Sequence, residues 1–240
     1  MPQPKPEGFL VVIPARGGSK RLPRKNLMKI GQESLLGRAI RCVDTLDKVS
    51  EICVTTDDKE IADEALRYGP YVHFLRPEFL ATDNARTIDV VIHAVEWFEA
   101  KGRCFKGVIL LQPTSPFRAK QHVQGAIELF EVRGANGVVS VTEMEHPIQW
   151  CAQLSDDSSM EAFGESQGTQ QRSQDLKPYH RLNGAIYIFK TGAELREKGI
   201  VYDKNTIAYQ MDSVSSVDID TEADFLLARA MWQLGQEKKQ

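Results

Sequence analysis

A run of cations follows an apolar segment near the start of the chain, in "VVIPARGGSKRLPRKNL" (residues 11–27). Six basic residues and no acidic residue lie between Arg16 and Lys29. The two glycines and Ser19 let backbone amides approach an anion, while arginine and lysine supply charge-assisted hydrogen bonds. The spacing matches neither a P-loop nor a dinucleotide-binding fingerprint. The segment predicts a phosphate site directly after a buried strand, and a solvated basic loop is the alternative.

The opposite charge gathers near the end of the chain, in "VDIDTEAD" (residues 217–224). In an extended chain Asp218 and Asp220 project to the same side, where paired carboxylates can bind a hard divalent cation such as Mg²⁺. Such an ion would meet phosphates held by the basic loop. The alternative is helix capping, because Thr221 and Asp224 form a near capping box. Capping does not account for the two acids that flank the isoleucine, which favours the metal site.

Two further segments carry polar side chains next to apolar runs. The stretch "LLQPTSPFR" (residues 110–118) is stiffened by two prolines and offers Gln112 and Ser115, among others, for hydrogen bonds. Substrate recognition and a structural turn both fit this stretch. In "RLNGAIYIF" (residues 181–189), Arg181 could bind a carboxylate through two hydrogen bonds or form a surface ion pair.

Apolar runs alternate with helical periodicity along the chain, which predicts crossover units and an α/β fold with a mainly parallel sheet. Strands are expected at 9–13, 51–56, 72–75, 107–111, 137–141, 184–189 and 206–211. Helices are expected at 34–46, 59–68, 87–101, 120–132, 191–198 and 222–235. Residues 143–177 lack this rhythm and predict an excursion from the sheet, either a lid or a dimerisation arm. Ligands of such sheets bind beyond the carboxyl ends of the strands, so the four polar segments are expected to meet in one pocket.

Length and charge set further limits. The 240 residues suit one domain, which we place at 9–235, with flexible ends at 1–8 and 236–240. The net charge of -3 argues against nucleic-acid binding. No apolar run approaches the ~20 residues that span a bilayer, and the prolines of "MPQPKPEG" argue against a signal peptide. We therefore expect a cytoplasmic protein that binds neither nucleic acid nor membrane.

Five segments together resemble one enzyme family: "IPARGGSKRLPRKNL", "LRPEFLATDNA", "LLQPTSPFR", "RLNGAIYIF" and "VDIDTEADF". In this order they are similar to the cytidylyltransferases that activate nine-carbon acidic sugars, the CMP-sialic acid synthetases and their bacterial legionaminic and pseudaminic acid relatives. The resemblance runs from Phe9 to Leu227. It implies a Rossmann-like nucleotidyltransferase fold with helices on both faces of the sheet. It also implies a homodimer in which the protruding arm reaches into the partner's site.

The resemblance implies a Mg²⁺-dependent reaction of CTP with an acidic nine-carbon sugar, which gives the CMP-sugar and pyrophosphate. It places eight residues at the nucleotide: Arg16, Ser19, Lys20, Lys25, Asn26, Arg76, Ala81 and Asp83. It places Gln112, Ser115, Arg181 and Tyr187 at the sugar, and Asp218 and Asp220 at the metal. Arg16, Lys25 and Asp220 are the expected catalytic residues, because transfer at phosphorus needs positive charge at the phosphate oxygens. The other cations of the first loop, Arg21, Arg24 and Lys29, are expected to be solvated neighbours.

Two positions depart from the family pattern. Gln149 in "MEHPIQW" stands where relatives often have a lysine, and Ser173 in "QRSQDLKP" replaces the second arginine of "RRQDLP". By resemblance, the motif "NGAIYI" favours a sialic or legionaminic acid over pseudaminic acid as the substrate. Ketodeoxyoctonate cytidylyltransferases resemble the chain less, because their first loop lacks "GGSK". Two alternatives from other classes are a non-catalytic nucleotide-binding or regulatory protein, and an interaction module that binds through residues 143–177.

Overall fold

Six strands form the central sheet of the computed structural model, which describes residues 6–165 and 170–237. In sheet order they are β4 (Val49–Thr55), β1 (Glu7–Pro14), β5 (Phe105–Leu110), β7 (His180–Lys190), β6 (Gly137–Glu143) and β8 (Thr206–Gln210). Every strand of this sheet except β7 runs in the same direction. The mainly parallel α/β sheet expected from the alternation of elements is confirmed, with one antiparallel strand inserted near its middle.

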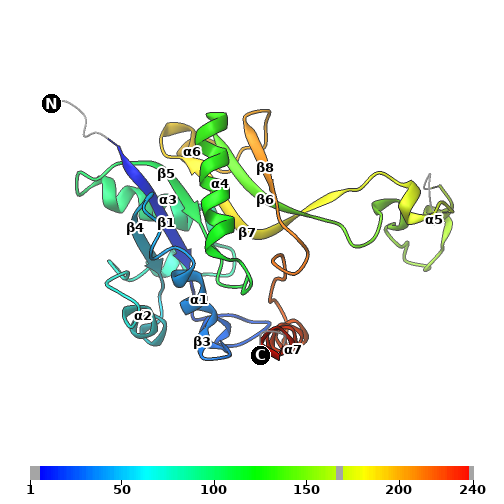
Figure 1. Cartoon of the computed structure of the whole chain (residues 1–240), viewed down its shortest axis with the longest axis horizontal. Coiled ribbons are helices and arrows are strands. Elements are labelled where there is room, and N and C mark those ends of the chain that lie inside the picture. The colour runs from blue at the N-terminus through cyan, green and yellow to red at the C-terminus, as the bar shows by residue number, and fades with distance from the viewer. Residues whose placement is uncertain (1–5, 166–169, 238–240) are drawn as a thin grey trace.

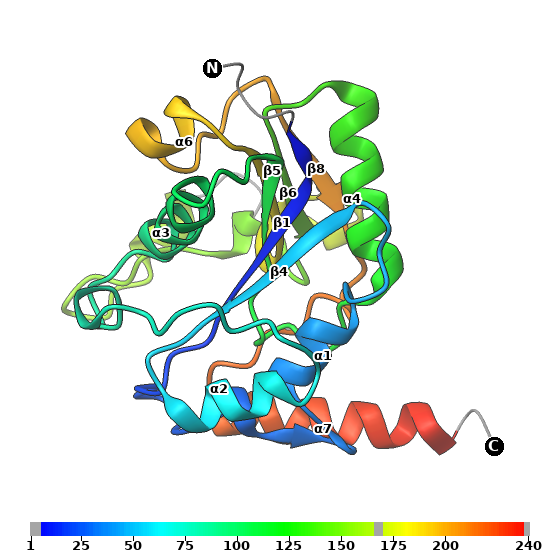
Figure 2. The same cartoon turned by 90° about the vertical axis from the view of Figure 1, so that its left-hand side faces the viewer.

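Helices cover both faces of this sheet (Figure 2). On one face lie α1 (Leu35–Arg41), α2 (Lys59–Leu66) and α4 (Lys120–Arg133), and on the other lie α3 (Thr87–Glu99) and α6 (Ala193–Lys198). Successive side chains of β1 alternate between two core clusters: Val11 packs in the first and Val12 in the second, and both are fully buried. A strand that is buried on both faces must be apolar at every position, which is why β1 is a continuous apolar run.

Polar side chains set where two of these helices begin. Ser34 Oγ accepts a hydrogen bond of 2.9 Å from the Gly37 amide and caps α1. Asp58 Oδ1 accepts one of 3.0 Å from the Ile61 amide and caps α2. Such caps satisfy amides that helix geometry leaves without partners. Because Asp58 follows β4 closely, its cap also places a carboxylate near the edge where the parallel strands end.

The antiparallel direction of β7 determines which of its residues approach this edge. Leu110, the last residue of β5, pairs with Tyr187, and Thr142 of β6 pairs with Arg181. The carboxyl ends of the parallel strands are the edge at which sheets of this kind bind ligands. It is therefore the first part of β7, and not its end, that lies beside the ligand-binding edge.

Past the sheet, β6 and β7 continue as a two-stranded ribbon with a loop-rich tip (Figure 1). We call residues 143–180 the arm; its tip carries α5 (Glu161–Glu165). The segment expected to leave the sheet, 143–177, lies in this arm. Large apolar side chains are exposed along it, namely Ile148, Trp150, Leu154, Met160 and Tyr179. Apolar side chains gathered on a protruding element are typical of an interaction surface.

A third core cluster joins the two ends of the chain. It combines Leu22 and Ile30 from the first loop region with Ile219 and Phe225 from the end of the chain. The elements involved are a small hairpin of β2 (Lys29–Ile30) and β3 (Glu33–Ser34), and the long helix α7 (Glu222–Glu237). This packing brings the basic loop and the acidic segment, which are far apart in sequence, to the same side of the molecule.

The structure differs from the sequence expectations at several places. The strand expected at 72–75 is wrong, because this segment contributes only an isolated bridge between Thr56 and Leu75. The expected flexible ends are partly regular, since β1 begins at Glu7 and α7 continues to Glu237; residues 1–5 and 238–240 lie outside the described residues. Within residues 6–165 and 170–237, no helix is long and apolar enough to cross a membrane.

Candidate active site

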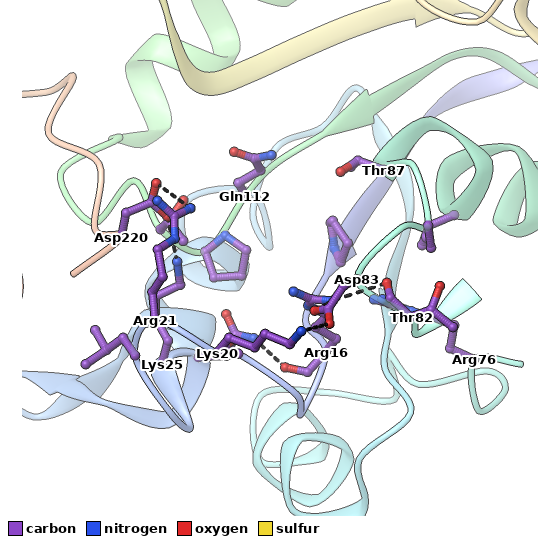
Figure 3. Close-up of a pocket in the computed structure, with 18 of the residues that line it drawn as sticks. Arg16, Lys20, Arg21, Lys25, Arg76, Thr82, Asp83, Thr87, Gln112 and Asp220 are labelled. Carbon is purple, nitrogen blue, oxygen red and sulfur yellow. Dashed lines mark hydrogen bonds and ion pairs between the residues drawn. The ribbon is translucent and has the colours of Figure 1, made fainter. Parts of the chain in front are cut away.

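A cavity of about 450 Å³ lies where β1 and β5 end (Figure 3). Ten of the expected site residues line it: Arg16, Ser19, Lys20, Lys25, Asn26, Arg76, Asp83, Gln112, Asp218 and Asp220. Three of the four polar segments singled out in the sequence thus contribute to one cavity. The fourth segment, residues 181–189, supplies none of its lining residues.

The first group of charges in the cavity centres on Asp220. Lys25 Nζ donates to Asp220 Oδ1 at 3.1 Å and to the carbonyl oxygen of Ile219 at 2.8 Å. Arg21 Nη2 lies 3.0 Å from Asp220 Oδ2. Two cations from the first loop therefore share one carboxylate from the end of the chain. Such an arrangement suits a site that receives a phosphate and a metal ion, because the charges needed for both are already in place.

Lys25 begins a short 3-10 helix (Lys25–Leu27), and the residue before it has an unusual backbone conformation. Arg24 has a φ of 57°, in the left-handed region that costs a non-glycine residue about 1 kcal/mol or more. Its side chain forms ion pairs with Asp58 and Glu60 at the start of α2. These contacts hold Arg24 in the conformation that turns Lys25 toward the cavity.

The second group of charges centres on Asp83. Arg16 Nη1 lies 3.0 Å from Asp83 Oδ1 and donates to the carbonyl oxygen of Thr82 at 3.1 Å. Lys20 Nζ lies 2.5 Å from Asp83 Oδ2. Hydrogen bonding and charge from Lys20, followed by Arg16, hold the pKa of the Asp83 carboxyl below its usual value. Asn26 Nδ2 donates to the Arg16 carbonyl oxygen at 3.1 Å and fixes the backbone of the loop.

Arg76 forms the inner wall of the cavity on the side of β4. The residue is buried, and its Nε donates to Thr55 Oγ1 at 3.2 Å, while Nη2 donates to the Thr55 carbonyl oxygen at 2.5 Å. Burial lowers the pKa of Arg76 to about 10, which still leaves the guanidinium charged at neutral pH. A buried arginine that lines a cavity favours an anionic ligand.

Asp218 carries the clearest sign of a missing partner. Its Oδ1 is buried and has no hydrogen-bond partner among the described residues. Burial raises the pKa of the Asp218 carboxyl, against the opposing effect of a hydrogen bond from Thr114. An unpartnered buried oxygen beside a second carboxylate is a donor set that a hard cation satisfies.

The cavity fits Mg²⁺ better than a metal held only by protein ligands. No group of three or more histidine, cysteine, aspartate or glutamate side chains in the described ranges is placed to hold an ion. Mg²⁺ usually binds one or two carboxylates and completes its shell with water and substrate phosphates. Asp218 and Asp220 are two such carboxylates in a cavity that is otherwise rich in cations.

The capping interpretation of the acidic segment is confirmed for Thr221 and Asp224, the residues that suggested it. Asp224 Oδ2 accepts hydrogen bonds from the Thr221 amide at 2.7 Å and from Thr221 Oγ1 at 2.8 Å. Thr221 Oγ1 in turn accepts from the Asp224 amide at 3.3 Å. Thr221 and Asp224 thus cap the start of α7, while Asp218 and Asp220 line the cavity.

Four expected site residues do not line the cavity. Ala81 precedes Thr82 in the turn that does line it. Ser115 is buried, and its Oγ has no partner within the part of the chain that the structure describes. Arg181 is exposed on β7 beside the arm, and Tyr187 is half-buried and stacks on Phe189. The role of Ala81 at the nucleotide and those of Ser115, Arg181 and Tyr187 at the sugar stay predictions.

The two glycines of the first loop allow the path of its backbone, and neither of them lines the cavity. The Gly17 amide donates to Asp57 Oδ1 at 3.1 Å, so it is not free for an anion. A Cβ at Gly17 would lie 2.7 Å from Asp58 Oδ2, which explains why a glycine is needed there. Gly18 has open space around it and does not line the cavity.

Some residues that line the cavity were not expected from the sequence. Arg21, expected to be solvated, pairs with Asp220 in the cavity, whereas Arg24 pairs with α2. Thr87, at the start of α3, also lines the cavity and was not singled out. No local signal distinguishes Arg21 from its neighbours, because its partner comes from the opposite end of the chain.

Two solved structures share the fold of this chain. The chain superposes with a TM-score of 0.68 on CMP:2-keto-3-deoxy-manno-octonic acid synthetase complexed with CTP, at 18% identity over 96% of this chain and 100% of that one. It superposes with a TM-score of 0.63 on 4-diphosphocytidyl-2C-methyl-D-erythritol synthase from Anaerococcus prevotii, at 14% identity over 95% of this chain and 96% of that one. The fold is that of a nucleotidyltransferase. Within this class the chain belongs to the cytidylyltransferase family, whose model matches residues 10–234.

Three relatives of the chain are named for particular sugar acids. The chain is 38% identical to the CMP-N,N'-diacetyllegionaminic acid synthase of Legionella pneumophila, over 95% of this chain and 98% of the relative. It is 31% identical to the pseudaminic acid cytidylyltransferase of Campylobacter jejuni, over 95% and 97% of the two chains. It is 34% identical to the N-acylneuraminate cytidylyltransferase of Escherichia coli, over 96% of this chain and 54% of that longer protein. The resemblance to this family is therefore confirmed.

Proposed function

We propose that this enzyme transfers CMP from CTP to the anomeric hydroxyl of a nine-carbon keto sugar acid, with release of pyrophosphate. The observation that carries the proposal is the cavity at the ends of β1 and β5, in which cations from the first loop face Asp218 and Asp220. Three relatives that match nearly all of this chain are named for CMP transfer to acids of this kind. A protein that only bound nucleotide would need the cations but not the two carboxylates.

The loop residues bind and orient the triphosphate. Arg16 and Lys20 contact Asp83 in this structure, and both are placed to exchange that carboxylate for phosphate oxygens. Lys25, whose ammonium contacts Asp220, neutralises charge at the α-phosphate as the sugar hydroxyl attacks. Ser19 and Asn26 complete the nucleotide side of the cavity, together with the Ala81–Asp83 turn and Arg76.

Asp218 and Asp220 are the residues that would hold Mg²⁺. When bound, the ion supplies positive charge at the reacting phosphate and a template for in-line attack. The two carboxylates fix its position, and Arg21 and Lys25 remain close to take part of the phosphate charge. No covalent intermediate with the protein is needed, because orientation and charge stabilisation account for this type of transfer.

The proposed sugar is of the legionaminic or sialic acid type. The Legionella relative has the highest identity of the three and matches over 95% of this chain and 98% of its own length. Gln112 lines the cavity on the side away from the basic loop and is a candidate contact for the sugar (Figure 3). Pseudaminic acid and ketodeoxyoctonate are the alternative substrates.

We further propose a homodimer that uses the arm. Its exposed apolar side chains, such as Ile148 and Trp150, would be covered by a second copy of the chain. Arg181 lies beside the arm and outside the cavity of its own chain. In such a dimer Arg181 would bind the sugar carboxylate in the partner's cavity.

The proposal is tested by the identity of the nucleotide and the product. The purified enzyme is incubated with N,N'-diacetyllegionaminic acid, Mg²⁺ and each of CTP, UTP, ATP and GTP, and products are identified by mass spectrometry. We expect the CMP-sugar from CTP alone and no product when EDTA removes divalent ions. Equal use of several nucleotides, or product formation in EDTA, would contradict the proposal.

A further inference from the structure

β7 bends where the sheet ends and the ribbon of the arm begins. Its pairing with β6 shifts register between Val139 and Val141. At the bend Gly184 has a φ of 74°, a left-handed conformation that favours glycine. A Cβ at this position would lie 3.0 Å from Gln112 Oε1. The bend therefore brings the backbone of β7 close to a side chain that lines the cavity.

Asn183, the residue before this glycine, uses both ends of its side-chain amide. Its Oδ1 accepts hydrogen bonds from Ser140 Oγ at 2.6 Å and from the Ala185 amide at 3.1 Å. Its Nδ2 donates to Ser216 Oγ at 2.9 Å. The side chains of Asn183, Ser140 and Ser216 are all buried, with relative exposures of 3%, 0% and 1%. Buried polar groups that satisfy one another in this way fix a single local arrangement.

Ser216 lies in the segment that connects β8 with α7, residues 211–221, which contains neither helix nor strand. The segment is held at its start, where the Met211 amide donates to the Val141 carbonyl oxygen at 2.9 Å. It is held near its end, where the Ile219 amide donates to the Thr114 carbonyl oxygen at 2.9 Å. Between these two points, the side chain of Ser216 accepts the hydrogen bond from Asn183.

Asp218 lies between the last two attachments, two residues after Ser216 and one residue before Ile219. The carboxylate accepts a hydrogen bond from the Thr114 side chain. Its buried Oδ1 has no partner among the described residues, so the backbone on either side also determines much of its position. Ile219 is fully buried in the third core cluster and fixes the far side. Asn183, through Ser216, fixes the near side.

We propose that Asn183 is a positioning residue for the metal-binding carboxylates, and that it acts through Ser216. This inference rests on the proposed Mg²⁺ site at Asp218 and Asp220. It assigns the bend in β7 a function: the same residue that shapes the base of the arm also holds the metal-binding segment. Residues that orient metal ligands from outside the coordination shell commonly change metal affinity when they are removed.

The test measures metal binding directly, in Ser216→Ala and Asn183→Ala variants. Mn²⁺ replaces Mg²⁺ as a paramagnetic probe, and its affinity for the CTP complex is obtained by electron paramagnetic resonance titration. We expect Mn²⁺ to bind about tenfold more weakly in both variants. The Mg²⁺ concentration that gives half-maximal turnover should rise in parallel, with much of the turnover recovered at saturating Mg²⁺.

Ser140→Ala is the matched control. Ser140 bonds to the same Asn183 oxygen and also accepts from the Ile186 amide at 2.8 Å, so its removal weakens the β7 bend. None of the hydrogen bonds that its side chain makes within the described residues reaches the segment that carries the carboxylates. We expect Ser140→Ala to lower the melting temperature while leaving Mn²⁺ affinity unchanged.

Different results would contradict the positioning role of Asn183 and the Mg²⁺ site at Asp218 and Asp220. If Ser216→Ala binds Mn²⁺ as tightly as Ser140→Ala does, the positioning role is wrong, and this holds even if Asn183→Ala fails to fold. Asp218→Asn is measured alongside. If it too leaves Mn²⁺ affinity unchanged, the metal site itself is wrong.

Discussion

Lys25 Nζ lies 3.1 Å from Asp220 Oδ1, although the two residues are 195 positions apart in the chain. The contact joins the basic loop after β1 to the acidic segment before α7. The Lys25 side chain is 14% exposed and that of Asp220 is 39% exposed, so the pair lies at the wall of the cavity rather than in the core. Both groups are thus accessible from the cavity.

Replacing Lys25 tests the role of the loop in transition-state stabilisation. We expect Lys25→Met to lower kcat/KM by a factor on the order of 100 or more, because a fixed charge at the developing phosphate charge is lost. The matched control is Lys29→Met, since Lys29 is exposed and does not line the cavity. Pyrophosphate release is the measurement, with the melting temperature of each variant as a check on folding. Equal activity of the two variants would remove Lys25 from the mechanism.

Replacing Asp220 tests the acidic half of the site. We expect Asp220→Ala to abolish measurable turnover, since a bound metal contributes several kcal/mol to reactions of this class. The fold should survive, because the Asp220 side chain is partly exposed and its partners are Lys25 and Arg21. Circular dichroism and turnover at saturating Mg²⁺ are measured against Glu222→Ala, an exposed acid in the same region. Near-normal turnover of Asp220→Ala at saturating Mg²⁺ would refute the metal assignment.

The fold was largely predictable because burial leaves a plain trace in the sequence. β1 is apolar at every position from Phe9 to Ile13, since both faces of the strand are covered. The same reasoning failed at 72–75, where Val72 packs against one core cluster and Phe74 against the other. That alternation reflects packing between two cores and not strand pairing, and the composition of the segment does not distinguish the two.

The site was predictable as two halves but not as a set of contacts. The basic loop and the acidic pair were each visible as unusual charge patterns in short stretches. The pairing of Arg21 with Asp220, and of Arg24 with Asp58, depends on the tertiary path of the loop. The orientation of β7 was also hidden, because an apolar run does not reveal whether a strand is parallel or antiparallel to its neighbours.

Mixing two inactive variants tests the proposed dimer. We expect Lys25→Met and Arg181→Ala homodimers each to have little activity. Co-expressed with different tags, they should recover about a quarter of wild-type activity, because half of the dimers are mixed and half of the sites in those contain neither substitution. Light scattering confirms the oligomeric state of each preparation. If mixed dimers form and activity does not recover, Arg181 does not act in the partner's cavity.

A charge network away from the cavity predicts a pH dependence of stability. His73 Nε2 lies 3.3 Å from Glu51 Oε1, and this hydrogen bond raises the pKa of His73 against the effect of burial. Arg103, which pairs with Glu51, opposes the shift, and the rings of Trp97 and Phe98 pack on the imidazole. A raised folded-state pKa means that the folded protein binds the proton more tightly than the unfolded chain.

The contribution of His73 should therefore be complete below its unfolded pKa of about 6.5 and lost as the pH rises through the raised value in the folded protein. We expect the free energy of unfolding of the wild type to fall, relative to His73→Gln, as the pH rises above about 6.5. Urea unfolding at several pH values gives the difference. Parallel curves for the two proteins would show that His73 is not linked to folding.

The most direct test of the central claim is pyrophosphate release from CTP with a panel of acidic sugars at saturating Mg²⁺. The panel contains N,N'-diacetyllegionaminic, N-acetylneuraminic, pseudaminic and ketodeoxyoctonic acids. The proposed function predicts Mg²⁺-dependent release with the nine-carbon acids, fastest with a legionaminic or sialic acid. If CTP raises the melting temperature but none of the sugars releases pyrophosphate, the protein binds the nucleotide without using it, and the assignment as a sugar-activating enzyme is wrong.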